Sequence, residues 1–390
     1  MRDAGIGRAL LAVAALLAGL VPWWMAREEG AKSFPGFSVE SGPTGVGDSA
    51  ATGAFFRTAQ VNTASTHTKS HSAALAELSD GTLVAAWYAG SGEGAADVAI
   101  YLSRRGVDGA WSEPAAVMTR ERVQADLRRN VISLGNPLLL PDDSGRLGLL
   151  FVSIAAGRWS GSSMNLAWSE DGGLTWGAAR KLTMNPLANL SALPRNPPAR
   201  LVGGGWAVPV YEEFLGKFPE TLWLRPRGEG WSSAVSRVEG GVYVLQSALV
   251  PLAVDRAVSF FRDFRPARWM SASWSDDAGR TWTKPAATGL PNRDSGLCAI
   301  RLSDGAILSA FNDLSPGKRE NLRLALSEDE GRTWRTIATL AEEAGSEFSY
   351  PNLIRTSDGT IRMVYSARQT QILFAEFNEA WVHEQAEAAR

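Results

Sequence analysis

The sequence predicts an all-β fold, a six-bladed β-propeller, because two short turn patterns repeat along the chain. The first pattern is Ser-x-Asp-x-Gly-x-Thr-Trp, which occurs at residues 169–176, 275–282 and 327–334. The three starts are 106 and 52 residues apart, and 106 is two periods of 53. A repeat of about 50 residues made of a few short strands has the size of one propeller blade.

A second pattern, a Gly- or Asp-containing turn followed by an apolar strand, indicates that the number of blades is six. It occurs at residues 79–83, 143–147, 203–206, 254–257, 303–306 and 357–360. The segments 103–111 and 222–231 read as altered copies of the first pattern, at places where the period requires one. Six repeats therefore predict six blades.

Each residue type in the first pattern has a role in a tight turn. The Asp side chain can cap its own turn, Gly supplies a positive φ, and Thr-Trp returns to a strand with an aromatic ring to bury. No segment before the end of the chain shows sustained helical periodicity. We expect one all-β domain over residues 55–384, followed by a tail or frayed helix at 385–390.

The first 54 residues differ from the repeats. Residues 9–25 form an apolar run of 17, which two arginines precede and two tryptophans close. This predicts a membrane anchor within residues 1–27, or a cleaved signal peptide. Residues 28–54, rich in Gly, Ser, Pro and Thr, predict a flexible linker. We expect the propeller to be exported: anchored in the inner membrane facing the periplasm or the outside, or secreted after cleavage.

Composition excludes several classes of function. The chain has 390 residues and a formal net charge of −2, which argues against a nucleic-acid partner. One cysteine, Cys298, permits no internal disulfide and no cysteine-based zinc site, and three histidines leave little room for a histidine metal cluster. We therefore expect no cofactor and no metal.

The repeated turns resemble the Asp boxes of the sialidase superfamily, whose members are six-bladed propellers, over about residues 61–381. Asp boxes lie on outer hairpins and are structural, so they imply a fold rather than an activity. The superfamily binds a substrate carboxylate with three arginines. It uses a tyrosine nucleophile with a glutamate partner, together with a separate acid/base.

Three residues match this pattern in type and in blade. Tyr350, within Phe-Ser-Tyr-Pro-Asn-Leu, resembles the nucleophile. Arg319, ahead of the third Asp box, resembles the last arginine, and Arg262, near the end of a strand, resembles the middle one. The resemblance implies that these arginines bind substrate.

The acid/base position falls in the Gly-rich loop 90–97, where Glu93 and Asp97 are both candidates. A carboxyl group on such a loop, above an apolar rim, can have its pKa raised into a useful range. Either residue could equally be a solvated turn acid.

Two positions depart from the superfamily pattern. His71 stands where the first arginine is expected, and Gln246 stands where the glutamate partner of the tyrosine is expected. An amide cannot remove a proton, so Tyr350 lacks its usual base. A histidine does not reproduce the bidentate carboxylate contact of an arginine.

Phrases such as Arg195-Asn-Pro-Pro and Val210-Tyr-Glu-Glu-Phe also resemble a bacterial branch of sialidase-like proteins of unsettled activity. This adds candidates for a remodelled site, namely His71, Asn136, Arg195, Glu212 and Trp159.

Each of these candidates has two interpretations. His71 could be a base or a carboxylate donor, or only a structural hydrogen-bonding group. Arg195 could point a guanidinium into the mouth of the propeller, or pair with Glu212 or Glu213 and brace the blade. Trp159 could stack on a sugar, although most of the fifteen tryptophans must serve the core or the Asp boxes.

Together these features predict an exported carbohydrate-active enzyme, an exo-acting glycoside hydrolase on an acidic oligo- or polysaccharide. The arginines would hold a carboxylate, the loop acid would transfer the proton, and Tyr350 would be the nucleophile or would stabilise an oxocarbenium-like state. One alternative is a lyase in which Tyr350 and His71 remove a proton next to a uronate carboxylate. The other is a non-catalytic propeller that binds an envelope polysaccharide.

Overall fold

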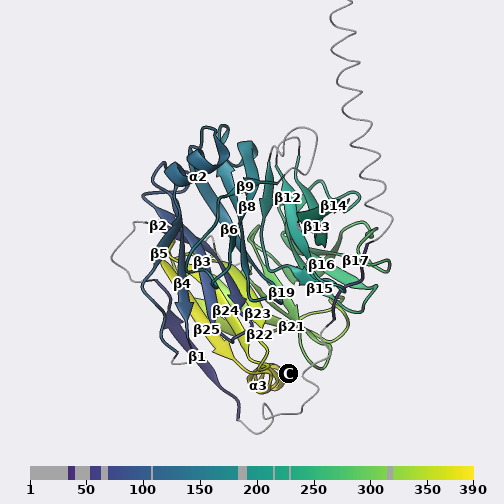
Figure 1. Ribbon diagram of the computed structural model, residues 1–390. Helices are drawn as coiled ribbons and strands as arrows, with labels where there is room; N and C mark the ends of the chain where they lie inside the picture. The colour runs from purple at the N-terminus through teal and green to yellow at the C-terminus, as the bar shows by residue number, and fades with distance from the viewer. Residues whose placement is uncertain are drawn as a thin grey trace, which may run out of the picture.

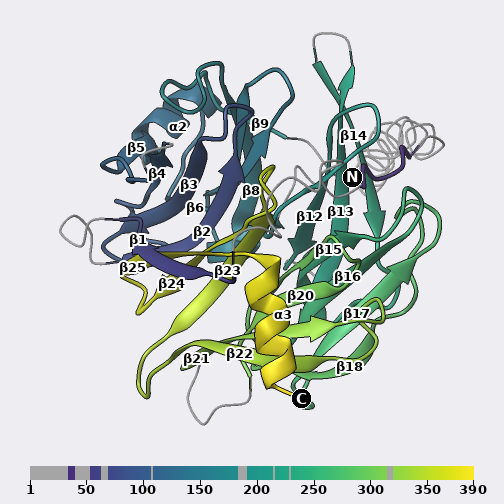
Figure 2. The same cartoon turned by 90° about the horizontal axis from the view of Figure 1, so that it is seen from below.

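The computed structural model describes residues 34–39, 53–62, 69–106, 109–182, 191–213, 216–227, 230–313 and 319–390. They form six antiparallel sheets arranged around a common centre (Figures 1 and 2). The predicted all-β six-bladed propeller is confirmed. The predicted anchor, residues 1–27, lies outside the described residues. None of the helices within the described ranges is both long enough and apolar enough to span a bilayer.

The six blades follow one another along the chain, and in blades one, two, four and five the strands pair in chain order. Blade one consists of β2 (Lys69–Glu77), β3 (Leu83–Gly90), β4 (Ala99–Arg105) and β5 (Ala115–Met118). Blade two consists of β6 (Ser133–Pro141), β7 (Leu147–Ile154), β8 (Ser162–Ser169) and β9 (Arg180–Lys181). Blade three consists of β10 (Ala192–Pro194), β11 (Ala199–Arg200), β12 (Trp206–Glu212), β13 (Phe218–Arg227) and β14 (Gly230–Arg237).

The second half of the ring repeats this plan. Blade four consists of β15 (Val244–Pro251), β16 (Ala257–Asp263), β17 (Trp269–Ser275) and β18 (Ala286–Pro291). Blade five consists of β19 (Cys298–Arg301), β20 (Ile307–Phe311), β21 (Asn321–Ser327) and β22 (Arg335–Glu342). Blade six consists of β23 (Phe348–Arg355), β24 (Ile361–Ala367), β25 (Gln371–Phe377) and, from the other end of the domain, β1 (Phe56–Gln60).

The hydrophobic core is divided into layers between neighbouring blades. The described residues contain six buried apolar clusters, and each joins one blade to the next, including blade six to blade one. Alternation along each strand explains this, because successive side chains point to opposite faces of a blade and meet a neighbour on each side. The innermost strands of adjacent blades also contact one another around the axis. A rigid ring of inner-strand ends results.

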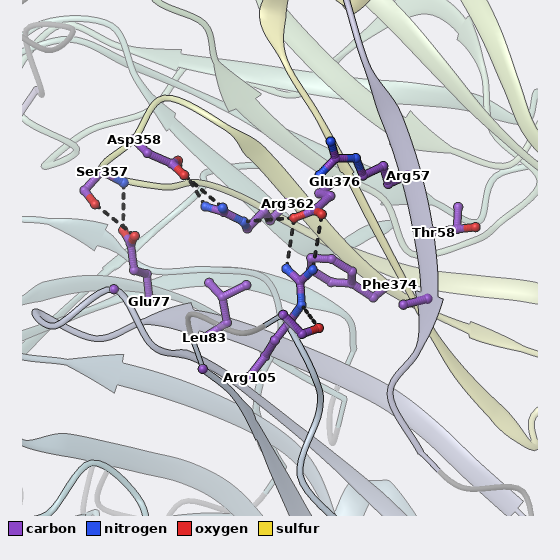
Figure 3. Close-up of a pocket in the computed structure, with 14 residues that line it drawn as sticks. Arg57, Thr58, Glu77, Leu83, Arg105, Ser357, Asp358, Arg362, Phe374 and Glu376 are labelled. Atoms are coloured by element: carbon purple, nitrogen blue, oxygen red, sulfur yellow. Dashed lines mark hydrogen bonds and ion pairs between the residues drawn. The ribbon is translucent and has the colours of Figure 1, made fainter. Parts of the chain in front are cut away.

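The ring closes where β1 pairs with β25, with Phe56 opposite Phe377. An ion pair joins blade one to blade six beside this closure, as Figure 3 shows. Arg105 of blade one donates from its two terminal nitrogens to the two oxygens of Glu376 in blade six, at 2.9 and 3.2 Å. Arg362 Nε lies 3.6 Å from the same carboxylate. These residues line a seam cavity of about 710 Å³.

The Asp boxes form the hydrogen bonds that their sequence predicts. In the first box, Asp171 accepts from the backbone N–H and the hydroxyl of Thr175, at 2.8 and 2.6 Å. Gly173 has a φ of 95° and donates its N–H to Ser169 Oγ at 2.7 Å, while Trp176 Nε1 donates back to Gly173 O at 3.1 Å. The other two boxes repeat these bonds.

The sequence argument did not predict a helix before the end of the chain, but the structure has one. Helix α2 (Arg120–Leu127) follows blade one, and the Thr119 side chain caps it by accepting from Arg122 N. This helix has only two turns, which is too short for a periodic pattern of apolar residues to be recognised. Its capping residue is therefore the one signal in the sequence. The terminal helix α3 (Glu379–Ala388) begins before the expected boundary at residue 384 and contacts β22.

Part of the segment that we expected to be a linker packs onto the propeller. Phe37 is fully buried in the cluster between blades three and four, and its N–H donates to Val254 O at 2.8 Å. An aromatic residue in a Gly- and Pro-rich segment is the signal for such an anchoring contact.

Candidate active site

Each of the six inner strands, or the segment beside it, carries a non-glycine residue in the left-handed backbone region, and blade three carries two. One from each blade is Ser72 (φ 55°), Asn136 (43°), Asn196 (70°), Gln246 (56°), Asp294 (56°) and Tyr350 (55°), and the second in blade three is Ser191 (69°). In β2, β6, β15 and β23 the residue sits in a one-residue register shift, a β-bulge. Such conformations cost about 1–3 kcal/mol each and cluster at functional sites, because a bulge re-aims a side chain. Three predicted site residues, Asn136, Gln246 and Tyr350, are among these residues.

A cavity of about 210 Å³ opens beside these strand ends. Its lining comes from five blades: Ser72, Tyr88 and Glu93 from blade one, Asn136 and Trp159 from blade two, Arg195, Tyr211, Glu213 and Lys217 from blade three, Gln246 and Arg262 from blade four, and Tyr350 from blade six. Seven predicted site residues thus converge on one cavity. Of the remaining four, His71 and Arg319 contact the ring of Tyr350, whereas Asp97 and Glu212 do not line the cavity.

The Tyr350 ring is surrounded by cations and by one imidazole. The guanidinium carbon of Arg195 lies 4.8 Å from the ring centroid, and that of Arg319 lies 5.2 Å from it. The His71 ring meets it edge to face at 4.8 Å. Gly296 makes room for this packing, because a Cβ there would lie 2.7 Å from Tyr350 Cδ1.

The electrostatics of this cluster favour ionisation of the phenol. Burial by itself raises the pKa of Tyr350, but the positive charges of Arg319, Arg262 and Arg195 together outweigh burial and the opposing charge of Glu93. The pKa of Tyr350 therefore lies below its ordinary value of 10.0. This is the behaviour expected of a nucleophile that cations activate.

A polar chain runs from blade two to blade five along one wall of the cavity. The Tyr211 hydroxyl accepts from Asn136 Nδ2 and from Gln246 Nε2, each at 3.3 Å. Gln246 Oε1 accepts from Arg262 at 3.2 Å, and Arg262 Nε donates to Asp294 at 2.7 Å. Gln246 therefore orients a guanidinium, a task that an amide can perform although it cannot act as a base.

The two acid/base candidates occupy different positions. Glu93 lines the cavity, and its carboxylate accepts from Trp159 Nε1 at 2.9 Å. Asp97 instead closes its own loop by accepting from the N–H and the hydroxyl of Ser91, at 2.9 and 2.8 Å. Gly135 allows Trp159 to lie over β6, since a Cβ there would lie 2.5 Å from the indole. The geometry favours Glu93.

His71 is neutral at physiological pH. Burial lowers its pKa to about 3, an effect that the charge of Glu347 only partly opposes. Its Nδ1 is buried and has no hydrogen-bond partner among the described residues. Glu347 accepts from Arg319 at 3.2 Å, so this carboxylate orients one of the two arginines on the Tyr350 ring.

Arg195 and Glu212 belong to different networks. Arg195 is 3% exposed and donates to the carbonyl oxygens of Ala73 and Pro351 at 3.2 and 3.4 Å. Glu212 lies 3.7 Å from Arg237 in an ion pair. Arg195 therefore lines the cavity, and its hydrogen bonds also brace blade three against blades one and six.

The sequence argument did not select several lining residues, among them Tyr88, Tyr211, Glu213 and Lys217. Strand alternation was the available signal for Tyr211: it neighbours Glu212 in β12, so the two side chains point to opposite faces. Among the described residues, no cluster of three His, Cys, Asp or Glu side chains could hold a metal ion.

Comparison with known proteins places the fold and the family. A family model described as a BNR repeat-like domain matches residues 81–363. The chain belongs to this BNR repeat-like family. Human Sialidase-4 is 30% identical over 211 residues, which is 51% of this chain and 36% of that protein. The chain thus matches about a third of that curated relative.

Solved structures share the propeller of this BNR repeat-like protein. A Hadza microbial sialidase superposes with a TM-score of 0.67 at 18% identity, covering 82% of this chain and 68% of that one. The intramolecular trans-sialidase of Ruminococcus gnavus, solved with oseltamivir carboxylate, gives 0.65 at 14% identity, covering 83% and 97%. A protein of unknown function from Dyadobacter fermentans gives 0.66 at 14%, covering 83% and 99%. The predicted resemblance to the sialidase superfamily is confirmed.

Proposed function

We propose that this BNR repeat-like propeller is an exo-acting, sialidase-like glycoside hydrolase that removes a terminal carboxylated sugar from a glycan. The observation that carries the proposal is the convergence of Tyr350, Glu93 and Arg262 on one cavity of about 210 Å³. The relatives named as sialidases support the same reaction class. A cavity of this size suits one sugar ring rather than a long polymer segment, which supports exo action.

In the proposed reaction, the Tyr350 oxygen, which has lost its proton to solvent, attacks the anomeric carbon as the glycosidic C–O bond breaks. Glu93 donates its proton to the departing oxygen, and the sugar remains bonded to Tyr350. Water then attacks the anomeric carbon, Glu93 takes a proton from it, and the tyrosine oxygen leaves. Arg262 and Arg319 bind the sugar carboxylate, and Trp159 both orients Glu93 and offers a ring to the sugar.

Export is part of the proposal, with the propeller held outside the cytoplasm by the apolar N-terminal segment or released from it. The apolar run at residues 9–25 and its flanking arginines and tryptophans support this.

Turnover by the full chain on a panel of sialosides and uronate-containing oligosaccharides tests the function, with products followed by mass spectrometry. We expect a saturated monosaccharide. Glu93→Gln should lower kcat by about 10²–10⁴-fold on natural glycosides. It should lower kcat much less on aryl glycosides, whose leaving groups need no proton. The matched control is Asp97→Asn on the same loop, which should retain turnover.

Two other results would replace this proposal. An unsaturated sugar product would mean elimination, with Tyr350 acting as a base on a uronate. Binding of the glycans without any product would mean a non-catalytic propeller.

A further inference from the structure

We propose that Arg195 is a positioning residue that stabilises Tyr350 as a phenolate, and so takes over the part that a carboxylate base would play at the position of Gln246. The proposal rests on the proposed function for the use of that phenolate, but the ionisation itself is a property of the free protein.

The contact crosses the axis of the propeller. Arg195 comes from blade three and Tyr350 from blade six, which lie opposite each other in a ring of six. The guanidinium carbon lies 4.8 Å from the ring centroid, and the side chain is 3% exposed. Its hydrogen bonds reach the carbonyl oxygens of Ala73 and Pro351, while Nε has no partner among the described residues. The guanidinium is therefore desolvated against the ring.

The charges around Tyr350 are unevenly compensated. Arg262 forms an ion pair with Asp294 at 2.7 Å, and Arg319 forms one with Glu347 at 3.2 Å. Within the described residues Arg195 forms no ion pair, although an arginine remains protonated when buried. A buried cation without an anion is costly. A phenolate on Tyr350 would supply the missing negative charge.

Arg319 and Arg262 lower the pKa of Tyr350 more than Arg195 does, but each of them already pairs with a carboxylate. His71 is neutral because burial lowers its pKa to about 3. Burial raises the pKa values of Tyr88 and Tyr211, so both stay neutral. Glu93 opposes the phenolate with an effect that is smaller than those of Arg319 and Arg262 and larger than that of Arg195. Burial also raises the pKa of Cys298, to about 11, so it carries no charge.

The proton balance requires no partner base. Tyr350 loses its proton to solvent through the open cavity before substrate binds, and Arg195 stabilises the oxygen anion and the negative charge shared by the ring. The phenolate then forms the bond to the anomeric carbon as the proposed function requires.

The test is a pH titration of the full chain labelled with ¹³C at the tyrosine Cζ, without substrate, with Tyr350→Phe identifying the resonance. The chain has six tyrosines, and burial raises the pKa of Tyr88, Tyr101, Tyr211 and Tyr365. Tyr350 should therefore ionise at a lower pH than these four tyrosines. If it does not, the wild-type protein alone overturns the proposal.

Variants then assign the effect to Arg195. Arg195→Met should lower the phenolate fraction of Tyr350 at least tenfold at a fixed pH below its midpoint, and Arg195→Lys, which keeps the charge, should restore part of it. The matched control is Arg200→Met, in the same blade, whose guanidinium pairs with Asp143 away from the cavity. An unchanged titration in Arg195→Met would refute the proposal. If the protein turns over none of the glycans while the titration of Tyr350 still depends on Arg195, only the proposed function is refuted.

Discussion

Glu376→Gln should weaken the closure of the propeller, because Glu376 ties blade one to blade six. Its side chain is 9% exposed and that of Arg105 is 16% exposed, so the substitution leaves the partly buried Arg105 guanidinium without its anion, whereas Arg362 keeps its pair with Asp358. Glutamine has nearly the same shape, so no packing cavity confounds the result. Proposed groups Glu93 and Tyr350 lie on the two blades that this seam joins, so the closure also positions the reaction.

The magnitude follows from the burial of the pair. Removing one partner of a buried ion pair costs about 3–5 kcal/mol, and the partial exposure of Arg105 favours the lower end, about 3 kcal/mol. At roughly 2 °C per kcal/mol for a domain of this size, the melting temperature should fall by about 6 °C. The assay is thermal unfolding followed by circular dichroism at one scan rate. The control is Glu121→Gln, whose carboxylate is 67% exposed and pairs with Arg120, and which should melt with the wild type.

The pH dependence provides a second readout of the same contact. Burial raises the pKa of Glu376, but hydrogen bonding and charge from Arg105, with the charge of Arg362, bring it below its ordinary value of 4.5. A depressed carboxyl pKa contributes stability that is fully present above 4.5 and is lost as the pH falls through the folded-state pKa. The difference between wild type and Glu376→Gln should therefore be constant near neutrality and shrink in acid. Equal melting temperatures at neutral pH would refute the reasoning.

Three further substitutions test other parts of the structure. Gly135→Ala should displace Trp159, whose indole would lie 2.5 Å from the new Cβ, and raise KM more than it lowers kcat. Gln246→Glu adds a negative charge where Arg262 now donates at 3.2 Å, so the pKa of Tyr350 should rise in the ¹³C titration, and a fall would contradict the charge argument. Asp277→Ala, in the second Asp box, should cost about 1 kcal/mol in a urea melt and leave kcat unchanged.

The local features of the fold could be predicted from the sequence because their causes are local. An Asp box is held by hydrogen bonds between residues two to four positions apart, such as Asp171 with Thr175, so the pattern itself specifies the turn. Its period then sets the number of blades. The contribution of β1 to blade six could not be read in this way, because its partner β25 lies at the other end of the domain.

The residues of the candidate site also divide into those that a local sequence pattern could predict and those that depend on distant partners. Tyr350, Gln246 and Asn136 could be singled out because each stands in a short phrase near the start of an inner strand, where a β-bulge turns it to the axis. The contact between Arg195 and Tyr350 could not, since it joins opposite blades and no local pattern encodes it. The choice between Glu93 and Asp97 also depends on a residue from another blade, Trp159.

Arg195 could be kept in this position for structural reasons alone, because its donations to Ala73 and Pro351 tie blade three to blades one and six. A neutral side chain such as glutamine could make similar bonds to carbonyl oxygens, and it would avoid the cost of burying a charge. The structure uses a permanent cation instead, and it lies against a tyrosine in a strained left-handed conformation, φ 55°. The buried charge of Arg195 and the strained backbone of Tyr350 meet in the same contact. A phenolate on Tyr350 would offset the cost of burying the charge. The charge of Arg195, rather than its hydrogen bonds, is therefore what the ionisation of Tyr350 should reveal.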